Sequence, residues 1–62
     1  MSVRTVLAEV TDRLAAEFHA SDRVLVEAAV RVAHIRLRDH LNWGHAVESA
    51  ARARLQAIAI AA

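Results

Sequence analysis

DRVLVEAAVRVAHIRLR, residues 22–38, is the stretch that decides the fold. On a helix its polar positions recur every three or four residues and form one narrow stripe of about 80°. The members of this stripe are Arg23, Glu27, Arg31, His34 and Arg38. Nearly all other positions are apolar, over an arc of roughly 240° that only Arg36 interrupts. The stretch therefore predicts a helix over residues 22–38 that buries more than one of its faces.

Apolar residues at helical spacing also predict a helix on either side of this stretch, over residues 3–18 and 43–60. In the first they occupy an arc of about 120°, which is the width of a helix lying on one core. In the second, Val47, Ala51, Leu55 and Ile58 form the main apolar face. Small residues beside that face, Ala46, Ala50, Ala53 and Ala57, would let another helix approach closely. The sequence thus predicts one all-α domain over residues 1–62, a three-helix bundle.

Two short segments are predicted to join the helices. Ser21 or Asp22 can cap the helix of residues 22–38 through a side-chain oxygen, and Asn42 is a suitable cap for the next one. Trp43 is expected to cover the end of the bundle, and Gly44 to sit in a first helical turn or where backbones approach. The segment RDHLNWGH, residues 38–45, is therefore interpreted as a joint between helices.

The size of the chain favours self-association. A core in fewer than roughly 70–80 residues rarely contributes more than about 3–5 kcal/mol, and small domains usually need an additional constraint. The sequence has no Cys to form disulfides. Two neighbouring helices also cannot cover an apolar arc of roughly 240°. We therefore expect a homodimer that forms through the second apolar face of residues 22–38, helped by the C-terminal segment.

The expected positions divide into two sets. The predicted dimer interface consists of Val24, Val26, Val30, Ala33, Leu37, Ile58 and Ile60. The predicted core consists of Val6, Leu7, Val10, Leu14, Phe18, Leu25, Val32, Trp43, Val47 and Leu55.

No catalytic, cofactor-binding or metal-binding residue is predicted. A zinc site needs three or four ligands that converge on one point, and His34, His40 and His45 lack the spacing that places two side chains on one helical face. No Ser/His/Asp set, glycine-rich phosphate loop or HExxH motif is present. The expectation is a protein that is not an enzyme and holds no cofactor.

Nucleic acid, membrane and export receive less support. The net charge is only +1, with seven acids against eight basic residues, and such a balance is not typical of a nucleic-acid footprint. A small DNA-binding or antitoxin-like regulator stays open as the alternative, with Arg52, Arg54 and Gln56 on a reading helix. No apolar run reaches the ~18–20 residues of a membrane span, and the N-terminal residues do not resemble a signal peptide. Cytoplasmic localisation is expected.

Four segments resemble the three-helix bundle dimerisation domains of small actinobacterial proteins. They are VLAEVTDRLAAEF, VEAAVRVAHIRL, the Arg38–Asp39 pair and AVESAARARL, in the same order along nearly the whole chain. In that family a Pro-containing, acidic and aromatic passage is expected where this chain has HLNWGHAV. The resemblance implies an all-helical homodimer without chemistry of its own. It also implies a stand-alone protein or an N-terminal partner of arsenate-reductase-like phosphatase domains.

Overall fold

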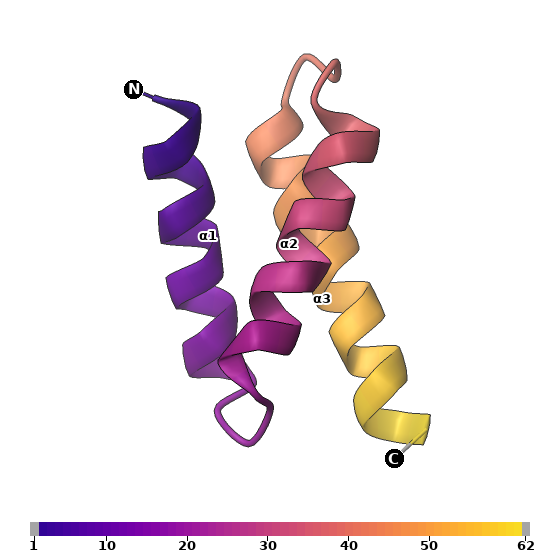
Figure 1. Cartoon of the computed structure of the whole chain (residues 1–62). Helices are drawn as coiled ribbons and strands as arrows, with labels where there is room; N and C mark the ends of the chain where they lie inside the picture. The colour runs from indigo at the N-terminus through magenta and orange to yellow at the C-terminus, as the bar shows by residue number, and fades with distance from the viewer. Residues whose placement is uncertain (1, 62) are drawn as a thin grey trace.

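The computed structural model describes residues 2–61 as three helices joined by two short turns (Figure 1). They are α1 (Val3–Glu17), α2 (Arg23–Leu37) and α3 (Trp43–Ala61). Each boundary lies within one residue of its predicted position. The prediction of an all-α three-helix fold is confirmed.

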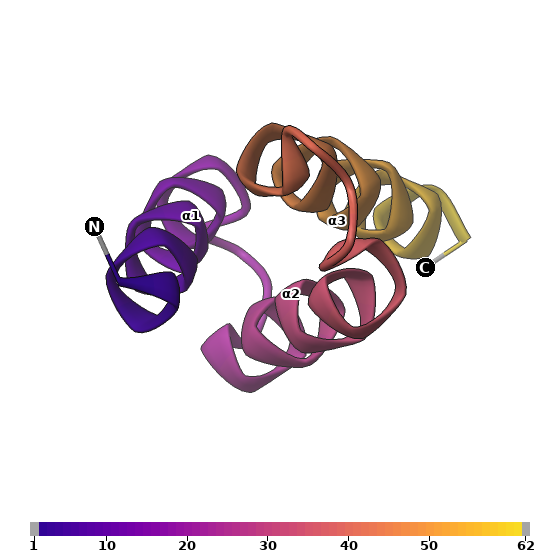
Figure 2. The same ribbon diagram turned by 90° about the horizontal axis from the view of Figure 1, so that it is seen from above.

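The helices alternate in direction and form a narrow bundle of 33 × 17 × 14 Å. Seen from above, they stand at the corners of a triangle, with α2 and α3 together on one side and α1 on the other (Figure 2). With 19 residues, α3 is longer than α1 and α2, which have 15 each. Its C-terminal end consequently extends past the ends of α1 and α2 (Figure 1).

Local capping bonds set the helix boundaries. The Ser2 hydroxyl accepts a hydrogen bond from the Thr5 backbone N–H at 3.1 Å, which satisfies a donor that a helix start otherwise leaves free. The Asp22 carboxylate does the same for the Val24 N–H at 2.9 Å. Of the two predicted caps of α2, Asp22 is thus the one used. At the start of α3 the Asn42 carbonyl accepts from the Ala46 N–H at 3.1 Å.

The core lies between all three helices. Its buried apolar members are Val10, Leu14, Val26, Ala29, Val30, Ala33, Val47, Ala51 and Leu55. Of the predicted core residues, Val10, Leu14, Val47 and Leu55 are therefore buried. Five others, Val6, Leu7, Phe18, Leu25 and Trp43, are half-buried and pack against this cluster. Val32 is half-buried and instead lines a hollow between α2 and α3.

Three residues predicted for the dimer interface lie in this core. Val26, Val30 and Ala33 are only 0%, 3% and 6% exposed, and Leu37 packs against the core beside them. Together they form the face of α2 that α1 and α3 cover. The structure places them in the core of the single chain. Periodicity shows that a helix has several apolar faces without showing which one meets its own neighbours.

The joint between α2 and α3 brings helix ends close together. A Cβ atom on Gly44 would lie 3.3 Å from Cγ1 of Val6, so the absence of a side chain lets α3 approach α1. The Trp43 ring is half-buried and lies 5.2 Å from the His34 ring, centroid to centroid. Trp43 thus packs at the end of the bundle, and RDHLNWGH is a joint between helices.

Candidate interaction surface

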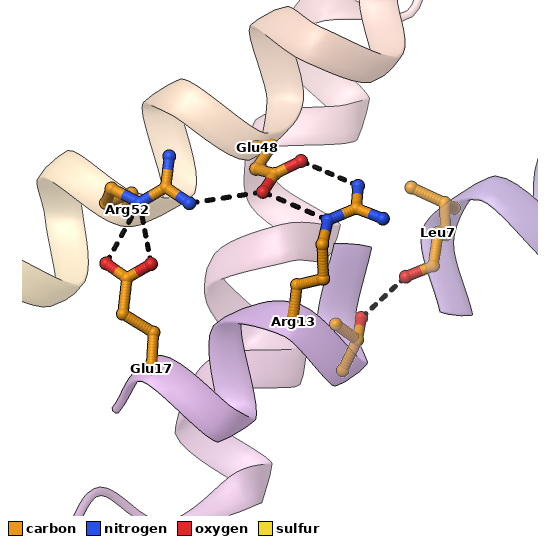
Figure 3. Close-up of polar contacts among 6 residues, drawn as sticks. Leu7, Arg13, Glu17, Glu48 and Arg52 are labelled. Atoms are coloured by element: carbon orange, nitrogen blue, oxygen red, sulfur yellow. Dashed lines mark hydrogen bonds and ion pairs between the residues drawn. The ribbon is translucent and has the colours of Figure 1, made fainter. Parts of the chain in front are cut away.

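The surface between α1 and α3 is closed by a network of ion pairs (Figure 3). The Arg13 guanidinium donates two hydrogen bonds to the Glu48 carboxylate, at 2.7 and 3.2 Å. Arg52 donates to the same carboxylate at 3.1 Å and to Glu17 at 2.9 and 3.1 Å. The four side chains join α1 to α3 over about one turn of each helix.

Glu48 is the centre of this network. Only 16% of its side chain is exposed. The hydrogen bond from Arg13 is the largest cause that lowers the pKa of Glu48, and Arg52 adds to it, while burial acts in the opposite direction. The carboxylate is therefore held in its charged form by two guanidinium groups.

The network pairs residues on different helices as well as on one. Arg13 pairs across the bundle with Glu48 and not with Glu9, which lies four residues before it on α1. Glu48 also pairs with Arg52, four residues later on α3, at 3.1 Å. Arg52 was also the first candidate for reading DNA. Two carboxylates hold its Nε and Nη2 atoms, so turning the guanidinium toward a base edge would break contacts between α1 and α3.

The side of α2 that faces away from the core is apolar and uncovered. Its members are Val24, Ala28, Val32 and Ile35, which we call the α2 strip. At about 100° per residue these positions share one side of the helix, roughly opposite to Val26 and Ala33. Val24 is 69% exposed and Ile35 is 61% exposed, with the half-buried Ala28 and Val32 between them. The wide apolar arc of α2 thus does leave a second face that the other helices of residues 2–61 cover only in part.

Only Val24 in this strip was predicted for the interface. Val32 was assigned to the core, and Ala28 and Ile35 were not singled out. The strip repeats at steps of four, four and three residues, which is the same helical spacing as the buried face. This spacing in the sequence predicts an apolar face at the α2 strip. The buried face of α2 has the same spacing, so the sequence does not show which of the two faces is buried.

A hollow of about 360 Å³ lies between α2 and α3, next to the α2 strip. It is lined by Ala29, Val32, Ala33, Arg36, Leu37, Ala50 and Arg54. Most of these side chains are small or apolar, and two guanidinium groups lie among them. Within residues 2–61, Arg36 and Arg54 form no ion pair. The hollow is therefore an apolar depression with positive charge and no acid.

Small residues continue the surface on α3. Ala46 is half-buried, and Ala50, Ala53 and Ala57 are exposed. Ile60 lies seven residues after Ala53, on the same side, and is 86% exposed. Ile58 instead continues the buried face of α3 and is 36% exposed, because it lies near the end of α3 that extends past the bundle.

Residues 2–61 also bear on metal binding and on membrane insertion. No group of three or more His, Cys, Asp or Glu side chains in this part of the chain could hold a metal ion. None of its helices is both long and apolar enough to cross a membrane. Comparison of the chain with known protein families, with characterised proteins and with solved structures found no match. The resemblance to the actinobacterial dimerisation domains therefore stays a prediction.

Proposed function

We propose that this chain is a non-catalytic self-association module that forms a homodimer through the α2 strip. The observation that carries the proposal is the exposure of Val24 and Ile35 on one side of α2, with Ala28 and Val32 between them. Solvent-exposed contiguous apolar surface on a small soluble domain commonly marks an interaction site.

The energetics favour the same conclusion. Fully burying a Val or Ile side chain contributes about 1.5–3 kcal/mol. A symmetric dimer would bury the side chains of the α2 strip on both copies, so each contribution occurs twice. A 62-residue domain without disulfides has a small stability of its own, on the order of 3–5 kcal/mol. Association would therefore stabilise the fold as well as join two chains.

Such a module would bring together two copies of whatever it is attached to or acts beside. The resemblance described above makes a phosphatase-like domain, fused or separate, the partner to examine first. In this role the chain itself contributes contacts and no reaction chemistry.

The substitution Ala28→Glu tests the proposal. It places a carboxylate at the middle of the α2 strip, where two copies would bring like charges together in a buried contact. We expect a dimer for the unmodified chain and at least about a tenfold weaker association for the variant. Light scattering behind a sizing column, at micromolar chain concentration, measures the mass directly.

The matched control is Ala16→Glu, the same change at an exposed position of α1. It should leave the mass unchanged. Circular dichroism of both variants at high concentration separates lost association from lost helix. A folded monomer of the unmodified chain at micromolar concentration contradicts the proposal.

A second candidate function is nucleic-acid binding. The favouring observation is that Arg36 and Arg54, on neighbouring helices, both line the hollow and have no acid partner within residues 2–61. Binding of this kind should weaken steeply with salt. An Arg54→Gln variant should lose duplex DNA in a low-salt binding assay, and no binding by the unmodified chain at low salt removes this candidate.

A further inference from the structure

The two edges of the α2 strip differ in character. On one edge lie Glu27, Arg31 and Arg38, all exposed. On the other lie the half-buried Leu25 and the apolar hollow shared with α3. A partner that covers the strip must contact both edges, so the arrangement of charges limits its orientation.

We propose that the strip binds a second copy of this chain in antiparallel orientation, with α2 against α2 and a two-fold axis that passes between Ala28 and Val32. The inference rests on the self-association proposed above and adds the geometry of the dimer. In this register Val24 lies opposite Ile35 of the second copy, and Ala28 lies opposite its Val32.

The apolar contacts fit this register. At a rise of about 1.5 Å per residue, Val24 and Ala28 lie about 6 Å apart along the helix, and Val32 and Ile35 about 4.5 Å apart. The two distances differ by about 1.5 Å, the rise of one residue. The α2 strips of two antiparallel copies therefore match along their length. The small Ala28 faces the larger Val32, which lets the helix backbones approach near the axis.

The charges favour the antiparallel orientation. A two-fold axis perpendicular to the helices places the polar edge of one copy beside the polar edge of the other. Glu27 then lies opposite Arg31 of the second copy, and symmetry forms this contact twice. Within residues 2–61, Arg31 has no ion pair, and Glu27 has only a 3.5 Å contact with Arg23. Both groups are therefore available to a partner.

A parallel dimer would be less favourable. Its two-fold axis runs along the helices and sets the polar edge of one copy over the apolar edge of the other. Arg31 would then approach the partner's hollow, whose lining contains no acid. The parallel dimer therefore lacks the Glu27–Arg31 pair that the antiparallel dimer forms twice.

The antiparallel dimer also places the two α3 helices beside each other. Since α3 lies beyond the apolar edge, both copies bring α3 to the same side of the interface. The small residues Ala50, Ala53 and Ala57 can then face those of the second copy. Arg36 near the end of α2 approaches the start of the partner's α2, where Asp22 supplies a carboxylate.

Cysteine cross-linking distinguishes the two orientations, because the chain has no natural Cys. The variants Val24→Cys and Ile35→Cys are mixed at equal amounts under mild oxidation, and products are identified by mass. Disulfides need Cα atoms within about 4.4–6.8 Å. The antiparallel dimer predicts that the mixed product, one chain of each variant, forms at least about ten times faster than either homodimer product.

Two other outcomes of the cross-linking experiment can be told apart from the expected one. Homodimer products from both variants with no excess of the mixed one overturn the antiparallel geometry but leave self-association standing. A mixture that is monomeric by light scattering overturns both proposals. Leu41→Cys, an exposed position in the turn between α2 and α3, gives the rate of random collision and serves as the control.

Charge reversal supplies an independent readout. Glu27→Arg and Arg31→Glu should each weaken the dimer about tenfold, because each places like charges opposite each other twice. The double variant E27R/R31E should restore association to near the original value. Failure of the double variant to recover overturns the proposed pairing. Glu9→Arg and Arg4→Glu, exposed reversals on α1, should leave the dissociation constant unchanged.

Discussion

A few single residues determine how the helices of this bundle contact one another and how polar groups in its core are satisfied. Glu48 accepts hydrogen bonds from Arg13 and Arg52 and so links α3 to α1 (Figure 3). Gly44 has no side chain where Val6 comes closest. Thr11, the one buried polar residue among residues 2–61, donates its hydroxyl hydrogen to the Leu7 carbonyl at 2.8 Å. Within that part of the chain no buried side-chain nitrogen or oxygen lacks a partner, so polar burial costs this small core little.

The pKa of Glu48 predicts a pH dependence of stability. The folded chain lowers this pKa below the ordinary value of 4.5. The stabilising contribution is therefore fully present above the unfolded value and is lost as pH falls through the folded value. Glu48→Gln should lower Tm by up to about 5 °C at neutral pH. Thermal melts at decreasing pH measure this effect. The Tm difference between the variant and the unmodified chain should shrink as the pH falls through the folded-state pKa of Glu48.

Glu9→Gln provides the comparison for this titration. Glu9 is exposed on α1 and forms no ion pair within residues 2–61. Its Tm should follow that of the unmodified chain at every pH. An equal Tm deficit for Glu48→Gln at neutral pH and at pH 3 contradicts the account of the network.

At the scale of the elements, polar caps mark where α1 and α2 begin, and apolar residues at helical spacing bury one side of each helix along its length. α2 begins at the Asp22 cap, and its C-terminal end leads into the turn where the His40 N–H donates to the Leu37 carbonyl at 3.0 Å. α3 runs on past its neighbours, which leaves Ile60 exposed. Helix boundaries were close to the predicted ones because capping is a local property.

Asp22 should contribute measurably to the stability of α2. Asp22→Ala removes the acceptor for the Val24 N–H and the negative charge at the helix start, and should reduce the free energy of unfolding by about 1 kcal/mol. Asp22→Asn keeps the acceptor and should lose less. Urea unfolding monitored by circular dichroism measures the difference.

The neighbouring residue is the control for this prediction. Ser21 was the other candidate cap, and the cap of α2 is Asp22. Ser21→Ala should therefore cost less than Asp22→Ala. The reverse order would show that Ser21 supplies the cap in solution.

The whole molecule is a small core with an unequal distribution of charge and apolar surface. Ion pairs close the contacts that α1 makes with α2 and α3. The side of α2 and α3 that faces away from α1 carries the α2 strip, the hollow and exposed alanines. This asymmetry, more than any single residue, supports self-association as the proposed role.

Two leucines test how much the core contributes. Leu14 is 0% exposed and Leu41 is 105% exposed. Leu14→Ala leaves a cavity and should cost about 2–5 kcal/mol, which is comparable to the whole stability expected for a chain of this size. Loss of the cooperative thermal transition, followed by circular dichroism, is the expected result.

Leu41→Ala removes the same atoms from a fully exposed position. It should change the free energy of unfolding by less than about 0.5 kcal/mol. A large effect of Leu41→Ala would show that the turn between α2 and α3 is covered in solution. A small effect of Leu14→Ala would contradict the described core.

The sequence alone determined the number of helices, their approximate boundaries and most of the core of α1 and α3. These follow from local bonds and from helices with a single apolar face, which have only one way to be buried. For α2 the tertiary structure decided the outcome, because nearly all sides of this helix are apolar. Only the positions of α1 and α3 show that Val26, Val30 and Ala33 are buried and that Val24, Ala28, Val32 and Ile35 remain uncovered. The pairing of Arg13 with Glu48 has the same reason, because contacts between helices depend on how the helices pack.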